Sequence, residues 1–229
     1  MRKKAVCLMS GGLDSTVTLV MALKEDYEVH GLTFDYGQRH RREVRSAKKI
    51  AEHYKIREHK IFKIDLNQIG GSALTDHRIT VPKGKTFHEI KESKDIPPTY
   101  VPARNTILLS IALSYAEAIG AEAVFIGANY LDSSGYPDCR PEYIEAFQKV
   151  AKLGTRCGIR GRPVEIRTPI ITFDKKTIVE RGAQMGVPFE LTWSCYEGGE
   201  KACGRCDSCV LRLSGFKQAG IKDPLEYGR

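Results

Sequence analysis

The sequence lacks any long apolar run. None of its 229 residues belongs to a stretch that approaches the roughly 20 apolar residues needed to span a membrane. The apolar run after Met1-Arg2-Lys3-Lys4 stops at Ser10, which is too short for the core of a signal peptide. Internal repeats and low-complexity tracts are also missing, and the hydrophobic (41%) and charged (28%) fractions are those of ordinary globular proteins. We therefore expect a globular, cytoplasmic protein.

Charge and cysteine content narrow the class further. Because no secretion signal is visible, the seven cysteines are expected to be reduced thiols rather than disulfides. The net charge of +8 favours an anionic partner, which could be ATP, another nucleotide-like molecule or RNA. Charge alone does not choose among these partners.

Strand and helix patterns alternate along the chain. Apolar segments predict strands at 4–9, 28–34, 58–66, 121–126 and 164–169. Helical periodicity is found at 15–23, 43–54, 105–118, 141–153 and 175–185. Such alternation is typical of an α/β fold with a parallel sheet flanked by helices. In such sheets ligands bind beyond the carboxyl ends of the strands, so the polar loop 127–140 is expected to share a cleft with the loop after the first strand.

Two segments depart from this alternation. Between residues 67 and 98 the periodicity fades, and charges interrupt each apolar cluster. We predict a long, partly mobile insertion here, with a lid over a binding site as the hypothesis for its role. After Pro188 the pattern turns to cysteines, which predicts a main domain over residues 1–188 and a small metal-bearing extension over 189–229.

A glycine loop follows the first predicted strand, with the sequence Ser10-Gly11-Gly12-Leu13-Asp14-Ser15-Thr16. Its glycines let backbone N–H groups approach a phosphate, and the following helix adds the positive end of its dipole. The loop has no lysine, unlike the P-loop that reaches the terminal phosphates, so its chemistry need not centre on the γ-phosphate. Asp14 is a candidate for placing Mg²⁺, and an N-cap role is the alternative.

This loop resembles the Ser-Gly-Gly-x-Asp-Ser signature of the PP-loop ATP pyrophosphatases. The resemblance implies that residues 1–188 bind ATP and hold its pyrophosphate while an acceptor oxygen is adenylated at the α-phosphate. The implied ATP-binding residues are Leu8, Met9, Ser10, Gly11, Gly12, Leu13, Asp14, Ser15, Thr16, Val17 and Thr18. A second family element, a lysine at the start of a late helix, would balance charge on leaving pyrophosphate. Lys176 is our candidate and Lys175 is its competitor.

Four cysteines near the end of the chain have the spacing of metal ligands. Cys195, Cys203, Cys206 and Cys209 form the pattern C-x7-C-x2-C-x2-C, which can surround Zn²⁺ with four thiolates. Such a site has no open position and is structural. An iron–sulfur cluster is the main alternative, followed by free thiols. Cys7 and Cys157 are expected to pack in the interior. Cys139 lies in the polar loop, but no histidine close in sequence supports a nucleophilic role.

Further motifs narrow the resemblance. They are Asp35-Tyr36-Gly37-Gln38-Arg39-His40, Tyr100-Val101-Pro102-Ala103-Arg104-Asn105 and Ser134-Gly135-Tyr136-Pro137-Asp138-Cys139-Arg140. Together with the terminal cysteines they resemble the QueC-type family of 7-cyano-7-deazaguanine synthases over nearly the whole chain. The resemblance implies a Rossmann-like fold of the adenine nucleotide alpha hydrolase type and a homodimer. It also implies conversion of 7-carboxy-7-deazaguanine and ammonia to the nitrile in queuosine precursor synthesis, driven by ATP with Mg²⁺.

A planar, purine-like substrate needs aromatic surfaces and polar groups for its edges. The candidates are Tyr36, Tyr100, Tyr136, Asp138 and Arg140. Arg104 is the catalytic candidate, and either it or Arg140 could pair with a carboxylate or phosphate through forked hydrogen bonds. Each candidate has a plainer role open to it, such as a helix-start contact for Arg104 or a turn for Asp138. Asp35 could meet a ribose or form a turn.

Two other functions fit part of the sequence. A PP-loop enzyme that thiolates tRNA bases would use the basic surface, and a zinc-ribbon protein that binds nucleic acid without catalysis would use the cysteines. No RNA-binding appendage is recognisable, so no stable nucleic-acid complex and no membrane contact are expected. No ammonia-producing domain is recognisable either, which leaves free ammonia or a partner as the source.

Overall fold

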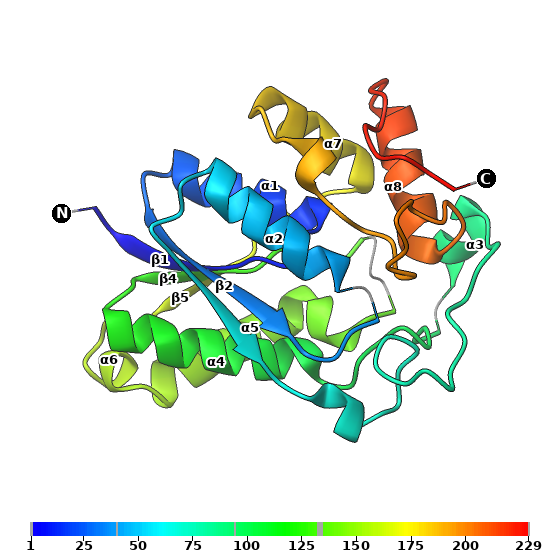
Figure 1. The fold of residues 1–229 in the computed structure, drawn as a ribbon. Coiled ribbons are helices and arrows are strands. Elements are labelled where there is room, and N and C mark those ends of the chain that lie inside the picture. Colours follow the sequence, from blue (N-terminus) through cyan, green and yellow to red (C-terminus); the bar gives the residue numbers. More distant parts are fainter. Residues whose placement is uncertain (1, 40, 94, 132–134, 229) are drawn as a thin grey trace.

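The computed structural model describes residues 2–39, 41–93, 95–131 and 135–228 (Figure 1). His40 and Ser134, which belong to the motifs above, lie outside the described residues. Within the described part of the chain, five strands form one sheet in the order β3-β2-β1-β4-β5, and all pairings are parallel. The strands are β1 (Lys4–Leu8), β2 (Glu28–Asp35), β3 (Glu58–Lys63), β4 (Ala123–Phe125) and β5 (Glu165–Arg167). The predicted α/β fold class is confirmed.

Helices cover both faces of this sheet (Figure 1). Central strand β1 is buried on both sides, with Val6 packed in one apolar cluster and Cys7 in the other. The first cluster contains α4 (Arg104–Ile119) and α5 (Pro141–Leu153), and the second contains α1 (Leu13–Lys24) and α2 (Arg42–His53). Since side chains alternate along a strand, each face of β1 receives its own layer of helices.

Several observed elements differ from the predicted ones. Strand β3 ends at Lys63, because Leu66–Gln68 turns into a short 3-10 helix (η1) whose Asp65 side chain accepts from the Asn67 N–H. Strands β4 and β5 are also shorter than their apolar segments. Short helices α6 (Arg156–Ile159) and η2 (Pro137–Cys139) were not predicted, because segments this short carry no periodicity.

The insertion contains a helix of its own, α3 (Phe87–Glu92). Thr86 and Glu89 form a capping box at its start, a local signal that the fading periodicity hides. Upstream, the Arg39 guanidinium donates to the carbonyls of Asp76 and Ile79 at 2.7 and 2.8 Å. The insertion is therefore held to the end of β2 by a charged group.

The cysteine-bearing extension packs against helices of the main domain. It consists of η3 (Phe189–Leu191) and the unpredicted helix α8 (Asp207–Gln218), which lies beside α7 (Lys175–Gln184) (Figure 1). Arg212 of α8 is 1% exposed and donates to both carboxylate oxygens of Asp223 at 2.8 and 3.0 Å. Breaking a buried pair of this kind costs about 3–5 kcal/mol, so this contact fixes α8.

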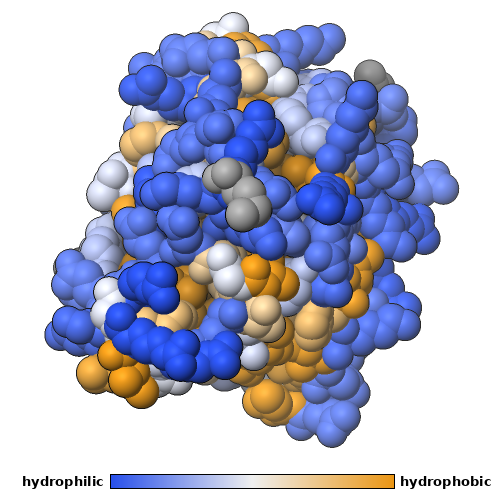
Figure 2. All heavy atoms as spheres, turned by 90° about the vertical axis from the view of Figure 1, so that its left-hand side faces the viewer, coloured by the Kyte–Doolittle hydropathy of each residue, from blue (hydrophilic) through white to orange (hydrophobic). Residues whose placement is uncertain are grey.

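The surface seen from the left of Figure 1 is hydrophilic over most of its area, with apolar side chains gathered toward its lower edge (Figure 2). Leu153 at the end of α5 and Ile159 at the end of α6 are exposed apolar residues, at 74% and 78% exposure. None of the helices among the described residues is long and apolar enough to cross a membrane.

Candidate active site

A cavity of about 290 Å³ opens at the carboxyl ends of β1, β2 and β4. It lies where the chain reverses its direction of travel across the sheet, the place where open parallel sheets bind ligands. Its wall combines the glycine loop, the segment after β2, the segment after β4, the insertion and the extension. The predicted shared cleft of the glycine loop and the loop after β4 is therefore present.

The glycine loop forms one end of this cavity. Gly11 has a φ of +82°, and a Cβ there would lie 2.2 Å from the carbonyl oxygen of Glu43, so only glycine fits. Ser10 Oγ accepts from the Gly12 N–H at 3.2 Å and donates to Ser15 Oγ at 2.9 Å. Most of the predicted ATP-binding residues line the cavity, namely Leu8, Met9, Ser10, Gly12, Leu13, Asp14 and Ser15.

The rest of that predicted set does not line the cavity. Gly11 packs against α2, and Thr16 Oγ1 donates to the Gly12 carbonyl at 2.7 Å. Val17 and Thr18 are both 0% exposed inside α1. These residues shape the loop and its helix from behind.

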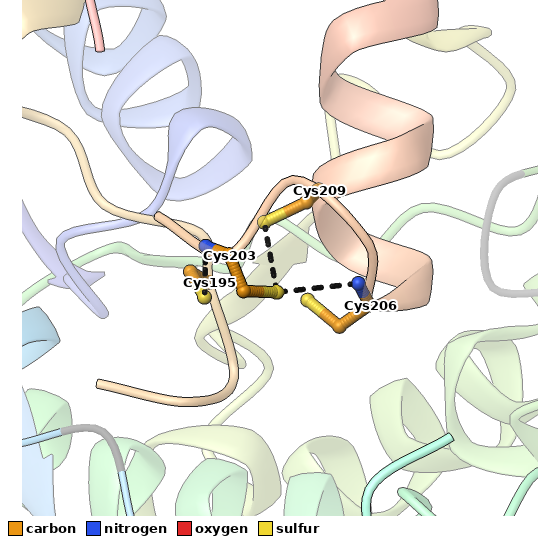
Figure 3. A group of neighbouring side chains, drawn as sticks. All are labelled: Cys195, Cys203, Cys206 and Cys209. Carbon is orange, nitrogen blue, oxygen red and sulfur yellow. Dashed lines mark hydrogen bonds between the residues drawn. The ribbon is translucent and has the colours of Figure 1, made fainter. Parts of the chain in front are cut away.

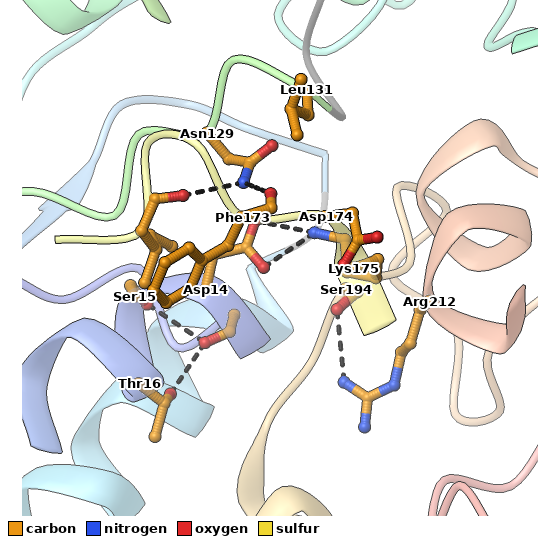
Figure 4. A network of polar contacts seen from close by, with 12 residues as sticks. Asp14, Ser15, Thr16, Asn129, Leu131, Phe173, Asp174, Lys175, Ser194 and Arg212 are labelled. Atoms are coloured by element: carbon orange, nitrogen blue, oxygen red, sulfur yellow. Dashed lines mark hydrogen bonds and ion pairs between the residues drawn. The ribbon is translucent and has the colours of Figure 1, made fainter. Parts of the chain in front are cut away.

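An ion pair joins the first turn of α1 to the start of α7. Lys175 Nζ lies 2.7 and 2.9 Å from the two carboxylate oxygens of Asp14 (Figure 4). Asp174 caps α7 by accepting from the Thr177 N–H at 2.8 Å, and the Asn129 amide donates to carbonyls in the segment just before α7. The lysine is thereby held at the loop by its helix start and by the segment after β4.

Lys176 does not join this group. Its ammonium pairs with Glu180 at 3.6 Å on the same helix, and its side chain is 45% exposed against 11% for Lys175. Consecutive helix residues point about 100° apart, so only one of the two can face the cavity. The competing candidate, Lys175, occupies the position we had expected for Lys176. The N-cap alternative for Asp14 is wrong, because Gly12 is the N-cap of α1 and no side chain caps that position.

Arg104 and two tyrosines form a second group on the cavity wall. Arg104 Nη1 donates to the Tyr36 hydroxyl at 3.2 Å, and its guanidinium lies 5.8 Å from the centre of that ring. Tyr136 OH lies 2.9 Å from Thr99 Oγ1. Burial raises the pKa of both Tyr36 and Tyr136, so both hydroxyls stay protonated and can donate. This part of the wall thus combines a guanidinium with the rings of Tyr36 and Tyr136.

Three other predicted substrate residues lie elsewhere. Tyr100, Asp138 and Arg140 line a second pocket of about 680 Å³, which Asn105 and the other residues at the start of α4 separate from the first. The Asp138 carboxylate accepts from the Asn105 N–H at 2.9 Å at the start of α4, and the Tyr100 hydroxyl accepts from the Ala103 N–H at 2.9 Å. The side chains of Tyr100 and Asp138 therefore hold the start of α4, whereas Arg140 donates to the Pro137 carbonyl. The Tyr100 ring still lies 5.9 Å from the ring of Tyr136, so the two pockets adjoin.

Cys139 lines the cavity, yet its environment suppresses thiolate formation. Burial raises the pKa of Cys139 to about 12, and the nearby Asp138 carboxylate acts in the same direction. Burial likewise raises the pKa of Cys7 to about 12 within the sheet. Neither thiol is suited to nucleophilic attack at neutral pH.

The four C-terminal cysteines converge as expected (Figure 3). Their sulfur atoms all lie within 4.8 Å of one another, and Cys203 and Cys209 are 4.0 Å apart. A tetrahedral ion with bonds of about 2.3 Å would place its sulfurs about 3.8 Å apart, so the arrangement fits a metal ion such as zinc. The pKa of Cys195 lies below its usual value, because the thiols of Cys206 and Cys209 and two backbone N–H groups donate to its sulfur.

The cysteine cluster also borders the cavity. Tyr196 follows Cys195 directly, Asp207 follows Cys206, and both residues line the wall together with Trp193. None of these three was predicted, since nothing in their local pattern separates them from ordinary packing or cap residues. Their one signal is that they adjoin metal-ligand positions.

A family model described as queuosine biosynthesis protein QueC matches residues 4–220. The chain belongs to the QueC family. It is 57% identical over 225 residues to the 7-cyano-7-deazaguanine synthase of Acetivibrio thermocellus, with 98% of each chain covered. It is 56% identical over 226 residues to the protein of the same name from Thermoplasma acidophilum, with 99% of this chain and 92% of that one covered.

Among solved structures, a predicted subunit of tRNA methyltransferase from Methanocaldococcus jannaschii aligns at 16% identity. The match has a TM-score of 0.49 and covers 100% of this chain and 93% of that one. QueC-family membership confirms the resemblance stated from the motifs. The roles of individual site residues remain predictions, and so does the division into residues 1–188 and 189–229.

Proposed function

We propose that this QueC-family chain is an ATP-dependent C–N ligase that converts 7-carboxy-7-deazaguanine and ammonia to 7-cyano-7-deazaguanine in queuosine precursor synthesis. The relatives named 7-cyano-7-deazaguanine synthase span nearly its whole length. The observation that carries the proposal is that one cavity holds both the glycine loop with its Asp14–Lys175 pair and the Arg104–tyrosine group. A nucleotide and a carboxylate acceptor can therefore meet there.

In this proposal the glycine loop holds the nucleotide. Backbone N–H groups at the start of α1 bind the pyrophosphate part of ATP, and the helix dipole supports the same charge. Lys175 stabilises the negative charge that grows on pyrophosphate as it leaves. Asp14 is the carboxylate at the loop, and we assign it to the Mg²⁺ that accompanies ATP and offsets phosphate charge.

Arg104 and the tyrosines hold the acceptor. The guanidinium pairs with the substrate carboxylate, and Tyr36 and Tyr136 offer ring faces to the planar heterocycle. A carboxylate oxygen attacks the α-phosphorus and pyrophosphate leaves. Ammonia then adds to the acyl carbon, and AMP and a proton depart to leave the amide. The amide oxygen attacks the α-phosphorus of a second ATP, pyrophosphate leaves and the nitrogen gives up one proton. Loss of AMP and the remaining N–H proton then gives the C≡N bond.

Zinc at the cysteine cluster, a homodimer in solution and a cytoplasmic location complete the proposal. Four sulfur donors around a closed site favour structural zinc over a reactive metal. One zinc per chain and no visible absorbance support this assignment, whereas absorbance in the visible range would point to iron–sulfur. Size-exclusion chromatography with light scattering tests the dimer. No stable nucleic-acid complex is part of this proposal.

Incubation with Mg-ATP, ammonium and 7-carboxy-7-deazaguanine, followed by mass spectrometry, tests the function. Nitrile together with AMP and pyrophosphate is the expected result. AMP without nitrile would contradict the proposed acceptor, and no AMP at all would contradict adenylation. Sulfur incorporation into tRNA would favour the thiolating PP-loop alternative, and salt-sensitive nucleic-acid binding without ATP turnover would favour the zinc-ribbon alternative.

A further inference from the structure

Asp207 carries a buried acceptor that the described residues leave unused. It is the first residue of α8, directly after the cysteine Cys206, and it lines the cavity. Its Oδ1 atom is shielded from solvent and has no hydrogen-bond partner among the described residues. An unpaired buried carboxylate oxygen is costly, so its retention at a cavity wall indicates a ligand that supplies donors.

The other acidic residues on the cavity wall are accounted for. Asp14 pairs with Lys175, and Glu43 has an interaction of its own. Asp95 is exposed to solvent. Asp207 is the wall carboxylate, within the described chain, that has a shielded oxygen without a partner.

Backbone pairing fixes the position of Asp207. The Gly84 N–H donates to the Arg205 carbonyl at 2.9 Å, and Lys83 and Cys206 form an antiparallel bridge. These contacts join the insertion to the chain just before α8. Lys85 of the insertion also lines the cavity, close enough to Asp207 to act on its charge. The backbone that carries Asp207 is thus fixed by its pairing with the insertion.

The proposed substrate has an edge that matches this carboxylate. A guanine-type ring presents a ring N–H beside an exocyclic amino group, which gives two parallel donors. An ionised carboxylate has two oxygens that accept only, so it can take both donors in a forked arrangement. A ring that lacks the amino group offers one donor fewer and leaves one oxygen unpaired.

We propose that Asp207 accepts these two hydrogen bonds and thereby selects the guanine-type edge of the substrate. This inference rests on the proposed function. It places the substrate carboxylate at Arg104 and the donor edge at the start of α8, on walls of the same cavity. The cysteine cluster then has a role beyond holding the extension together, because it sets the position of the residue that reads the substrate.

The test compares 7-carboxy-7-deazaguanine with 7-carboxy-7-deazahypoxanthine, which lacks the amino group. We expect the wild-type protein to prefer the guanine-type acid by about 100-fold in kcat/KM, because a buried polar site rejects an analogue that leaves it unpaired. In Asp207→Asn this preference shrinks to within a few-fold, and the KM for ATP stays unchanged. Glu226→Gln is the matched control, since Glu226 is an exposed acid of the same extension that pairs with Lys201.

The outcomes separate this inference from the proposed function. Wild-type protein that forms nitrile but handles both acids equally overturns the role of Asp207 without any variant. Asp207→Asn that keeps the full preference, with its metal content and unfolding midpoint intact, overturns it as well. Wild-type protein that forms no nitrile from either acid refutes the proposed function instead. In that case, the affinities of the wild-type protein for the two acids are compared by calorimetry. Tighter binding of the guanine-type acid supports the inference, and equal binding overturns it.

Discussion

Lys175→Met removes the cation that pairs with Asp14 at the glycine loop. The lysine stem packs on α8, where a Cβ at Gly215 would come within 2.5 Å of Lys175 Cγ, and methionine retains a stem of similar shape. Removing a preorganised group that stabilises developing charge lowers kcat by about 10²–10³, which corresponds to about 2.7–4 kcal/mol. Asp14 is 29% exposed and can regain water, so the free energy of unfolding should fall by only about 1 kcal/mol.

The assay is the rate of pyrophosphate release under saturating ATP and acceptor, with urea unfolding measured in parallel. Lys176→Met is the matched control, and its kcat should change less than about 2-fold, because its partner Glu180 is a surface residue. The reasoning is refuted if Lys175→Met releases pyrophosphate at the wild-type rate. It is also refuted if Lys176→Met is the variant that loses activity.

Three further predictions follow from the same site. Gly11→Ala should lower the free energy of unfolding by about 3 kcal/mol or more, since the new Cβ would lie 2.2 Å from the Glu43 carbonyl oxygen. Gly186→Ala is the control, because Gly186 has a similar φ of +74° but open surroundings, and it should cost about 1 kcal/mol. Urea titration of both variants compares the two losses. Arg104→Met should lower kcat/KM for the acid about 100-fold, while the exposed Arg140→Met should leave it unchanged, and equal losses would contradict the separation of the two pockets. Removing the proposed metal with a chelator should lower the melting temperature and abolish nitrile formation together. Activity that survives full metal loss would contradict the proposed link between the cysteine cluster and the cavity wall.

The fold was predictable from the sequence because its strongest signals are local. Buried strands such as Lys4–Leu8 and the long helix Arg104–Ile119 carry clear periodicity, and parallel order follows from their alternation. Helix α8 was missed because its apolar pattern is broken, and its stability comes from long-range contacts such as Arg212 with Asp223. Contacts of that kind are invisible in a local window.

The site was predictable only where function constrains sequence spacing. The glycine loop was found because its phosphate-binding backbone groups belong to consecutive residues. The four cysteines were found because metal ligands follow a fixed spacing along the chain. The choice between Lys175 and Lys176 depends on how α7 is rotated against its neighbours, and no residue pattern encodes that angle. Asp207 was missed because, on our proposal, its hydrogen-bond donors belong to the substrate, and no sequence pattern shows them.

The cavity draws on nearly the full length of the chain, from Leu8 in β1 to Arg212 in α8. At synthesis rates of about 5–20 residues per second, these two walls leave the ribosome roughly 10–40 s apart. The glycine loop is therefore made well before α8, and the cavity lacks the wall that α8 supplies until this helix has been synthesised and has packed against the rest of the protein. A chain interrupted before α8 would lack this wall of the cavity, so the complete site forms only after nearly the whole polypeptide has been made.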